Sequence, residues 1–144
     1  MNACESILGL SPYQGGKPIE ELERELGIKN VIKLASNENP LGASLKVVEA
    51  IKQSLKEVHR YPDGNGYELK KSISNHLDVA MEMISLGNGS NELLELVARV
   101  FVCKNTDEVI FSQYAFVVYP LVTQALGATA KVAPAKEYGH DLNA

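Results

Sequence analysis

The segment Gly87–Glu92, which reads Gly-Asn-Gly-Ser-Asn-Glu, has the composition of a site that binds an anion such as a phosphate. It follows a short apolar run and precedes a strong helical pattern, so it connects a predicted strand to a predicted helix. Glycines allow the backbone to turn sharply and to approach a ligand closely. The first N–H groups of a helix are unpaired and lie at the positive end of its dipole, which favours a negative charge. Ser90 adds a hydroxyl donor, and an ordinary capped turn between strand and helix is the alternative.

Neither of two well-known phosphate motifs describes this turn. It lacks the Gly-Lys-Ser/Thr ending of a P-loop and the third glycine of the dinucleotide fingerprint. The histidines His59, His76 and His140 show no metal-ligand spacing, and the two cysteines form no CxxC pair. We therefore expect no metal centre, and the glycine turn is the main candidate for chemistry.

The composition of the 144-residue chain is typical of a globular protein, with 45% hydrophobic and 22% charged residues. Its formal net charge of −4, from 14 basic and 18 acidic residues, gives no electrostatic reason to expect nucleic-acid binding. No apolar run approaches the roughly 20 residues that span a bilayer, and the first ten residues lack the basic stretch of a secretory signal. Because two isolated cysteines favour a reducing compartment, we expect a cytoplasmic protein.

Three helices are predicted in the first half of the chain. Apolar residues recur at helical spacing over Ile19–Leu26, from near Ser44 onward, and over 69–77. The brief apolar run Val31–Ala35 is expected to be extended. Residues 1–17 contain closely spaced proline and glycine and are expected to be irregular. The elements of this half are therefore helices joined by turns.

The second half changes to alternating strands and helices. Strands are predicted at Met83–Leu86, Val109–Phe111 and Ala128–Ala133, with helices between them over Leu93–Phe101 and Phe116–Leu126. The order β-α-β-α-β implies right-handed crossovers and a largely parallel sheet with helices packed on it. We therefore predict an α/β fold whose sheet has an open edge, covered either by more chain or by a partner.

Five segments along the chain resemble the motifs of one enzyme family, the histidinol-phosphate aminotransferases of fold type I, which depend on pyridoxal phosphate. The ordered combination is specific, above all Asn-Glu-Asn-Pro-Leu-Gly and Tyr-Pro-Asp, and it covers nearly the whole chain. The segments are Ser11–Lys17, Lys33–Gly42, Arg60–Gly64, Gly87–Glu92 and, more weakly, Ala115–Tyr119.

The resemblance implies pyridoxal 5'-phosphate as the cofactor. Gly89 and Ser90 match the turn that holds the cofactor phosphate. Phe116 matches an aromatic residue that stacks on the pyridine ring, with Tyr114 as a competitor and core packing as the alternative for both. Tyr61 matches a tyrosine that reaches across a homodimer and donates a hydrogen bond to the partner's cofactor phosphate; the alternative is a tyrosine packed in a turn.

Two further residues match positions that line the substrate pocket of the family. Tyr13 lies on the N-terminal arm, where a core role is less natural. Asn37 lies in a turn, and making an Asx hydrogen bond there is the alternative. By the same resemblance, residues 1–35 form an N-terminal arm and short helix, 36–78 form part of the small domain, and 79–144 form the start of the large cofactor-binding domain.

The covalent chemistry of the family has no counterpart in this sequence. Such enzymes need an aldimine lysine, an acidic partner for the pyridine nitrogen and an arginine that clamps the substrate carboxylate. In the family these residues lie downstream of the matched motifs, and none of the eleven lysines matches the aldimine position. We therefore expect a fragment of an enzyme that exchanges an amino group between glutamate and imidazole-acetol phosphate, and we expect it to be inactive alone.

Other functions fit the same motifs. Aromatic-amino-acid aminotransferases and threonine-phosphate decarboxylases share the early motifs of the family. A non-catalytic phosphate-binding or interaction module would need only the glycine turn. A substrate screen separates the enzymes from one another, and the absorbance of the bound cofactor separates an enzyme from a module.

Overall fold

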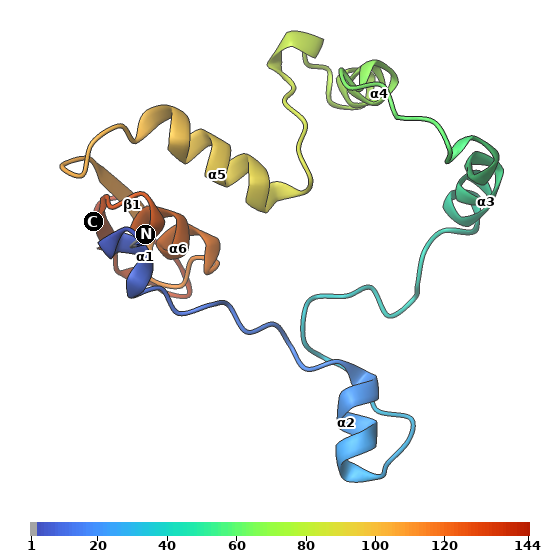
Figure 1. The fold of residues 1–144 in the computed structure, drawn as a ribbon, viewed down its shortest axis with the longest axis horizontal. Helices are drawn as coiled ribbons and strands as arrows, with labels where there is room; N and C mark the ends of the chain where they lie inside the picture. Colours follow the sequence, from blue (N-terminus) through green and yellow to red (C-terminus); the bar gives the residue numbers. More distant parts are fainter. Residues whose placement is uncertain (1–2) are drawn as a thin grey trace. The chain divides into compact units, whose positions relative to one another are not determined.

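The computed structural model describes residues 3–144, and its contacts divide the chain into two units (Figure 1). The first unit combines the residues up to Pro12 with Gly66–Ala144, and the second is Tyr13–Asn65. The domain division expected from the resemblance, after residues 35 and 78, stays a prediction. Of the helices in the described part of the chain, none has the length and apolar character needed to cross a membrane.

The second unit contains the first two predicted helices, and both are confirmed. Helix α2 covers Ile19–Leu26 and ends at Gly27, whose φ of 65° is the left-handed conformation that glycine adopts readily. Helix α3 covers Leu45–Ser54 and continues into a 3-10 turn, η1, at Leu55–Glu57. The run Val31–Ala35 forms no hydrogen-bonded strand.

The first unit contains four α-helices and one further 3-10 turn, and it holds the glycine turn. The third predicted helix is confirmed as α4, and the two helices expected in the α/β part are confirmed as α5 and α6. Irregular structure was expected throughout 1–17, which is wrong for α1, a short helix that packs on α6. The elements are α1 Glu5–Leu8, α4 Tyr67–Leu77, η2 Met81–Met83, α5 Ser90–Phe101 and α6 Val118–Ala125.

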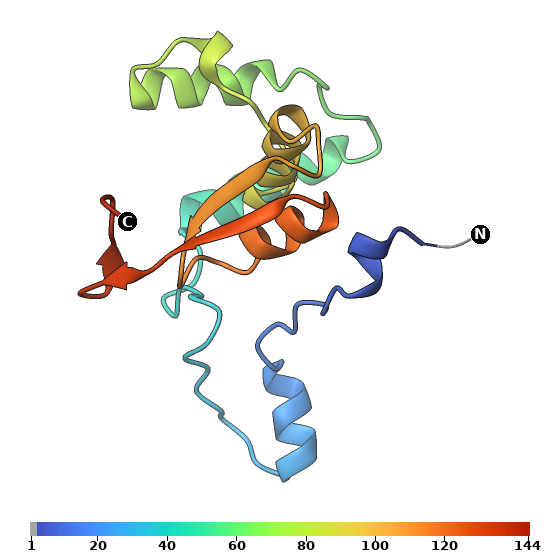
Figure 2. The ribbon, with the colours of Figure 1, turned by 90° about the vertical axis from the view of Figure 1, so that its left-hand side faces the viewer.

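Two of the three predicted strands are confirmed and lie side by side (Figure 2). Strand β1 covers Glu108–Ser112 and β2 covers Thr129–Ala133, and they pair in parallel in a continuous register. Helix α6 connects them and packs on β2, while α5 packs on α6, as expected for a parallel crossover. A short antiparallel hairpin, β3 Ala135–Lys136 with β4 Gly139–His140, follows.

The predicted strand at Met83–Leu86 is wrong. Met81–Met83 forms η2, and the residues that follow are not in a strand, although Ile84 has extended dihedral angles of −109° and 118°. A strand exists only when a neighbouring strand accepts and donates its backbone hydrogen bonds. Within residues 3–144 the parallel sheet consists of β1 and β2 alone, so the extended segment has no ladder to join.

The buried core of the described residues lies on α6. Val118 is 8% exposed and Thr123 is 2% exposed, and the Thr123 hydroxyl donates to the carbonyl of Tyr119 over 2.7 Å. Apolar side chains of α5 and β1 remain open to solvent, among them Phe101 and Ile110. Helix α5, which follows the glycine turn, is therefore held mainly by its contacts with α6.

Candidate functional site

The glycine turn directly precedes α5, and Gly89 is the residue that caps the helix. Its dihedral angles are φ 84° and ψ 173°, a combination that only glycine adopts without strain. Apart from Gly89 and its two chain neighbours, no heavy atom of the described residues lies within 4 Å of the position that a β-carbon at Gly89 would take. The backbone therefore turns in front of the helix and leaves open space beside it.

The carboxylate of Glu92 stabilises the glycine turn by accepting hydrogen bonds from Asn88. It accepts the backbone N–H of Asn88 over 2.5 Å, and the Asn88 side-chain amide lies 3.2 Å and 3.3 Å from its two oxygens. A glutamate at the third helical position that reaches back before the helix is a form of capping box. Gly87 makes room for it, because a β-carbon there would lie 2.8 Å from a Glu92 oxygen. This contact was not predicted from the sequence.

These hydrogen bonds lower the pKa of Glu92 below its ordinary value of 4.5, first through the Asn88 backbone N–H and then through the Asn88 side chain. Because the folded pKa is depressed, the stabilisation is present above the unfolded pKa and is lost as the pH falls through the folded value. We expect the Glu92 carboxyl signal in a carbon NMR titration to move at a pH below the ordinary range of a glutamate, and Asn88→Ala to bring it back toward that range by removing the side-chain hydrogen bonds. A midpoint in the ordinary range in the parent would contradict this role.

The first turn of α5 is suited to an anion. Its leading N–H groups have no acceptor within the helix, and the carboxylate of Glu92 bonds Asn88 rather than them. Ser90 is exposed at the first helical position, so its hydroxyl and backbone can both face a ligand. A phosphate in this position would be stabilised by the N-terminal end of the helix dipole.

Phe116 lies in the connection from β1 to α6, at the carboxyl end of β1. It is 52% exposed, and Tyr114 is 79% exposed. The connection is held by a bond from the Ala115 N–H to the Ser112 carbonyl over 2.9 Å. Both candidates for stacking on the cofactor therefore lie, partly exposed, in the connection between β1 and α6.

Phe116 follows the carboxyl end of β1, and in parallel α/β sheets this edge is where ligands bind. Gly89 and Ser90 lie at the N-terminal end of α5. Phe101, at the other end of α5, lines a groove of about 470 Å³ together with Glu108 of β1. That Gly89, Ser90 and Phe116 form one cofactor site stays a prediction.

The remaining predicted residues lie in the second unit. Tyr61 follows Arg60, which pairs with Glu57 over 2.9 Å, and its side chain is fully exposed. It is therefore not packed in its turn, as the alternative required. Tyr13 is 57% exposed at the start of the unit. Both phenols are accessible to a ligand or a second chain.

Asn37 has a left-handed backbone with φ 51°, directly after Ser36 with φ 69°. The Asx hydrogen bond of this turn is made by Asn39, whose side-chain oxygen accepts the Leu41 N–H over 3.0 Å. The Asn39 amide also donates to the Gly42 carbonyl over 2.9 Å. Asn37 thus lies in a left-handed turn just before the turn closed by Asn39, and its role in the substrate pocket stays a prediction.

The glycine turn before α5 and the parallel pair β1–β2 connected by α6 agree with the family comparison. Residues 29–144 match the model of a family described as aminotransferase class I and II. The chain belongs to this family.

Within this family, the chain is highly similar in sequence to proteins of one kind, as two examples show. The chain is 57% identical, over 99% of its length, to histidinol-phosphate aminotransferase 1 of Mannheimia succiniciproducens, and it covers 38% of that protein. It is 59% identical, over 93% of its length, to histidinol-phosphate aminotransferase 1 of Idiomarina loihiensis, and it covers 36% of that protein. The chain thus spans somewhat more than a third of the length of these curated relatives, and the predicted resemblance is confirmed.

A solved structure shows the same fold. The histidinol-phosphate aminotransferase of Sinorhizobium meliloti, in complex with pyridoxal-5'-phosphate, superimposes with a TM-score of 0.81 at 25% sequence identity. The match covers 96% of this chain and 36% of the other. The predicted fold class, an incomplete α/β portion of such an enzyme, is therefore confirmed.

Proposed function

We propose that the chain is the N-terminal part of a histidinol-phosphate aminotransferase of histidine biosynthesis. The reaction moves an amino group from L-histidinol phosphate to 2-oxoglutarate and gives imidazole-acetol phosphate and L-glutamate. The observation that carries this proposal is the identity of 53% to 59% to proteins of that name along nearly the whole chain. The glycine turn before α5 supplies the phosphate site that such an enzyme needs.

The cofactor of this proposal is pyridoxal 5'-phosphate, which supplies an electron-withdrawing ring to the carbon that carries the amino group. The open space beside Gly89 and the exposed Ser90 fit its phosphate. Backbone N–H groups of the first turn of α5 and the Ser90 hydroxyl would donate to the phosphate oxygens. The exposed ring of Phe116 would cover one face of the pyridine ring.

The proposal includes the substrate pocket and the assembly. Tyr13 and Asn37 line the substrate pocket, and Tyr61 of one subunit donates to the cofactor phosphate of the other in a homodimer. The full exposure of Tyr61 supports a role outside its own unit. We place the protein in the cytoplasm, with small-molecule substrates and no nucleic-acid or membrane partner, in keeping with its net charge of −4.

A hybrid enzyme tests the proposal. It consists of the Mannheimia succiniciproducens relative with its matched region replaced by this chain, and it is called the hybrid enzyme below. We expect L-histidinol phosphate to be its preferred amino donor, by at least about tenfold in kcat/KM over aromatic amino acids and threonine phosphate. A donor that leaves polar groups of a specific pocket without a partner usually loses this much or more. Glutamate formation with each donor is measured, and the unmodified relative is the control. A preference for an aromatic amino acid would mean that the chain comes from an aromatic-amino-acid aminotransferase instead. A hybrid enzyme that binds no cofactor would contradict the enzyme proposal and favour a non-catalytic phosphate-binding module.

A further inference from the structure

Helix α6 ends in a turn whose backbone N–H groups donate hydrogen bonds to carbonyl groups near the end of the helix. The turn contains Gly127 with φ 73°, and its bonds form a Schellman motif. The carbonyl of Ala125, in the same last turn of the helix, receives its donor from elsewhere in the chain. The backbone bonds are Leu126 N–H to Val122 O over 3.0 Å, Ala128 N–H to Thr123 O over 3.1 Å and Gly127 N–H to Gln124 O over 2.9 Å.

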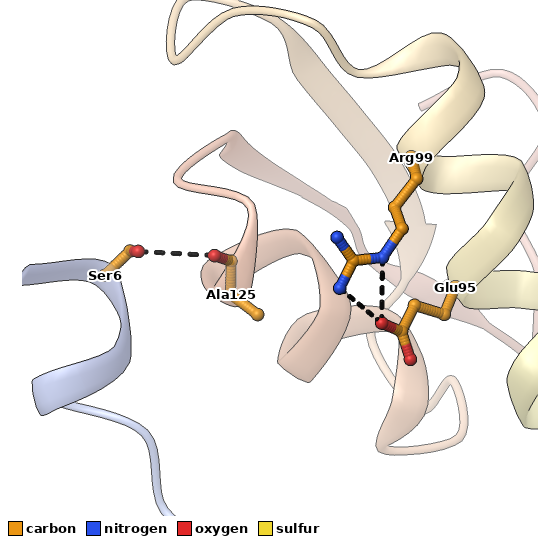
Figure 3. Close-up of polar contacts among 4 residues, drawn as sticks. All are labelled: Ser6, Glu95, Arg99 and Ala125. Atoms are coloured by element: carbon orange, nitrogen blue, oxygen red, sulfur yellow. Dashed lines mark hydrogen bonds and ion pairs between the residues drawn. The ribbon is translucent and has the colours of Figure 1, made fainter. Parts of the chain in front are cut away.

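The donor to Ala125 is the hydroxyl of Ser6, 119 residues earlier, over 3.2 Å (Figure 3). Ser6 lies on α1 and is half-buried. The two helices also lie close together at Gly9, where a β-carbon would lie 3.4 Å from the side-chain amide nitrogen of Gln124. Helix α1 thus supplies the donor for the Ala125 carbonyl at the end of α6.

The arm that carries α1 also follows a groove between α5 and α6. The groove has a volume of about 400 Å³, and Ile7 and Leu10 of the arm line it together with Leu121 of α6. On the α5 side, Arg99 donates to one carboxylate oxygen of Glu95 through Nε over 2.9 Å and through a terminal nitrogen over 2.7 Å (Figure 3). The arm up to Pro12 therefore belongs to the α/β unit by its contacts, although 53 residues of the other unit follow it in the sequence.

We propose that α1 anchors the N-terminal arm to α6 and that Ser6 is a positioning residue for Tyr13. This inference rests on the proposed function, in which Tyr13 lines the substrate pocket. Tyr13 directly follows Pro12, the last arm residue held in the unit of α6. A chain fixed at this point has fewer conformations to lose when Tyr13 orders on a substrate, so the anchor lowers the cost of substrate binding.

The contact itself is tested by hydrogen exchange in the hybrid enzyme. We expect Ser6→Ala to speed exchange of the amides of residues 7–10 by about fivefold, the factor that one net hydrogen bond supplies. Ser6→Thr keeps the hydroxyl and should exchange as the parent does. Leu8→Ala is the matched control, because Leu8 lies on the same helix but is 72% exposed. Equal exchange in Ser6→Ala and the parent would overturn the anchor.

The positioning role is tested by kinetics on the same proteins. We expect Ser6→Ala to raise KM for L-histidinol phosphate about threefold to tenfold, with kcat and the absorbance of the bound cofactor unchanged. Ser6→Thr should restore the parent KM. Faster exchange with an unchanged KM would overturn the positioning role and leave α1 as packing alone. An inactive parent hybrid enzyme would instead defeat the proposed function and the positioning role with it, while the exchange result would still decide whether the anchor exists.

Discussion

Replacement of Gly89 by alanine in the hybrid enzyme is expected to weaken cofactor binding by about tenfold to a hundredfold. The dihedral angles of Gly89 lie in a region that is closed to residues with a β-carbon, and forcing alanine into it costs about 1–3 kcal/mol. The turn relieves this strain by moving, and the N–H groups before α5 then no longer face a phosphate. Because each 1.4 kcal/mol is a factor of ten in affinity, the strain translates directly into cofactor affinity.

The measurement is a titration of the cofactor-free hybrid enzyme with pyridoxal 5'-phosphate, followed by absorbance. Gly27→Ala is the matched control, because Gly27 also has a positive φ, of 65°, and open space around it, but it ends α2 far from the glycine turn in sequence. We expect Gly27→Ala to lower the melting temperature without changing the affinity. Parent-like affinity in Gly89→Ala would show that the turn does not hold the phosphate.

The second large effect is the absence of catalysis by the 144-residue chain alone. With added cofactor, we expect its transamination rate to lie at least about 10⁴-fold below that of the hybrid enzyme, as is usual when a covalent catalyst is missing. None of its lysines matches the family position that bonds the cofactor. Lys17 is a poor substitute, because its hydrogen bond to Glu25 raises its pKa and keeps it an ammonium without a free electron pair.

Glutamate formation from L-histidinol phosphate and 2-oxoglutarate is measured for both proteins at equal concentration. The control is the hybrid enzyme with its cofactor-bonding lysine, contributed by the relative, replaced by alanine. We expect this variant to fall to the level of the chain alone. A measurable rate from the 144-residue chain would mean that one of its own lysines can replace the missing group.

The elements that the sequence predicted correctly are those with a local signal. Helices α2 to α6 have apolar residues at helical spacing with caps such as Gly27, and β1 and β2 are apolar runs on either side of a helix. Local periodicity determines such elements because each buries one face against its neighbours.

The elements that the sequence missed depend on distant or unusual partners. Helix α1 has only four residues and is held by α6, which local spacing cannot reveal. The hairpin β3–β4 turns through Glu137 and Tyr138, with φ of 48° and 63°, where Asn-Gly would have been the usual signal. The predicted strand at Met83–Leu86 failed for the opposite reason, since its pattern is local but no strand among the described residues pairs with it.

The candidate site shows the same distinction. Gly89 and Ser90 were predicted because the order strand, glycine turn and helix is itself the signal for an anion site. The bond from Asn88 to Glu92 could have been inferred from the spacing of a capping box, which places a glutamate at the third helical position. The hydrogen bond from Ser6 to Ala125 could not have been inferred in this way, because no pattern in the sequence around either residue indicates that the two segments meet.

The measurement that tests the central claim most directly is kcat/KM of the hybrid enzyme for L-histidinol phosphate, compared with that of the unmodified relative. If this chain is the N-terminal part of such an enzyme, its turn, arm and aromatic ring replace those of the relative, and kcat/KM should agree within about tenfold, or 1.4 kcal/mol of transition-state binding. A folded hybrid enzyme that carries the cofactor but has lost more than about a thousandfold in kcat/KM would contradict the claim.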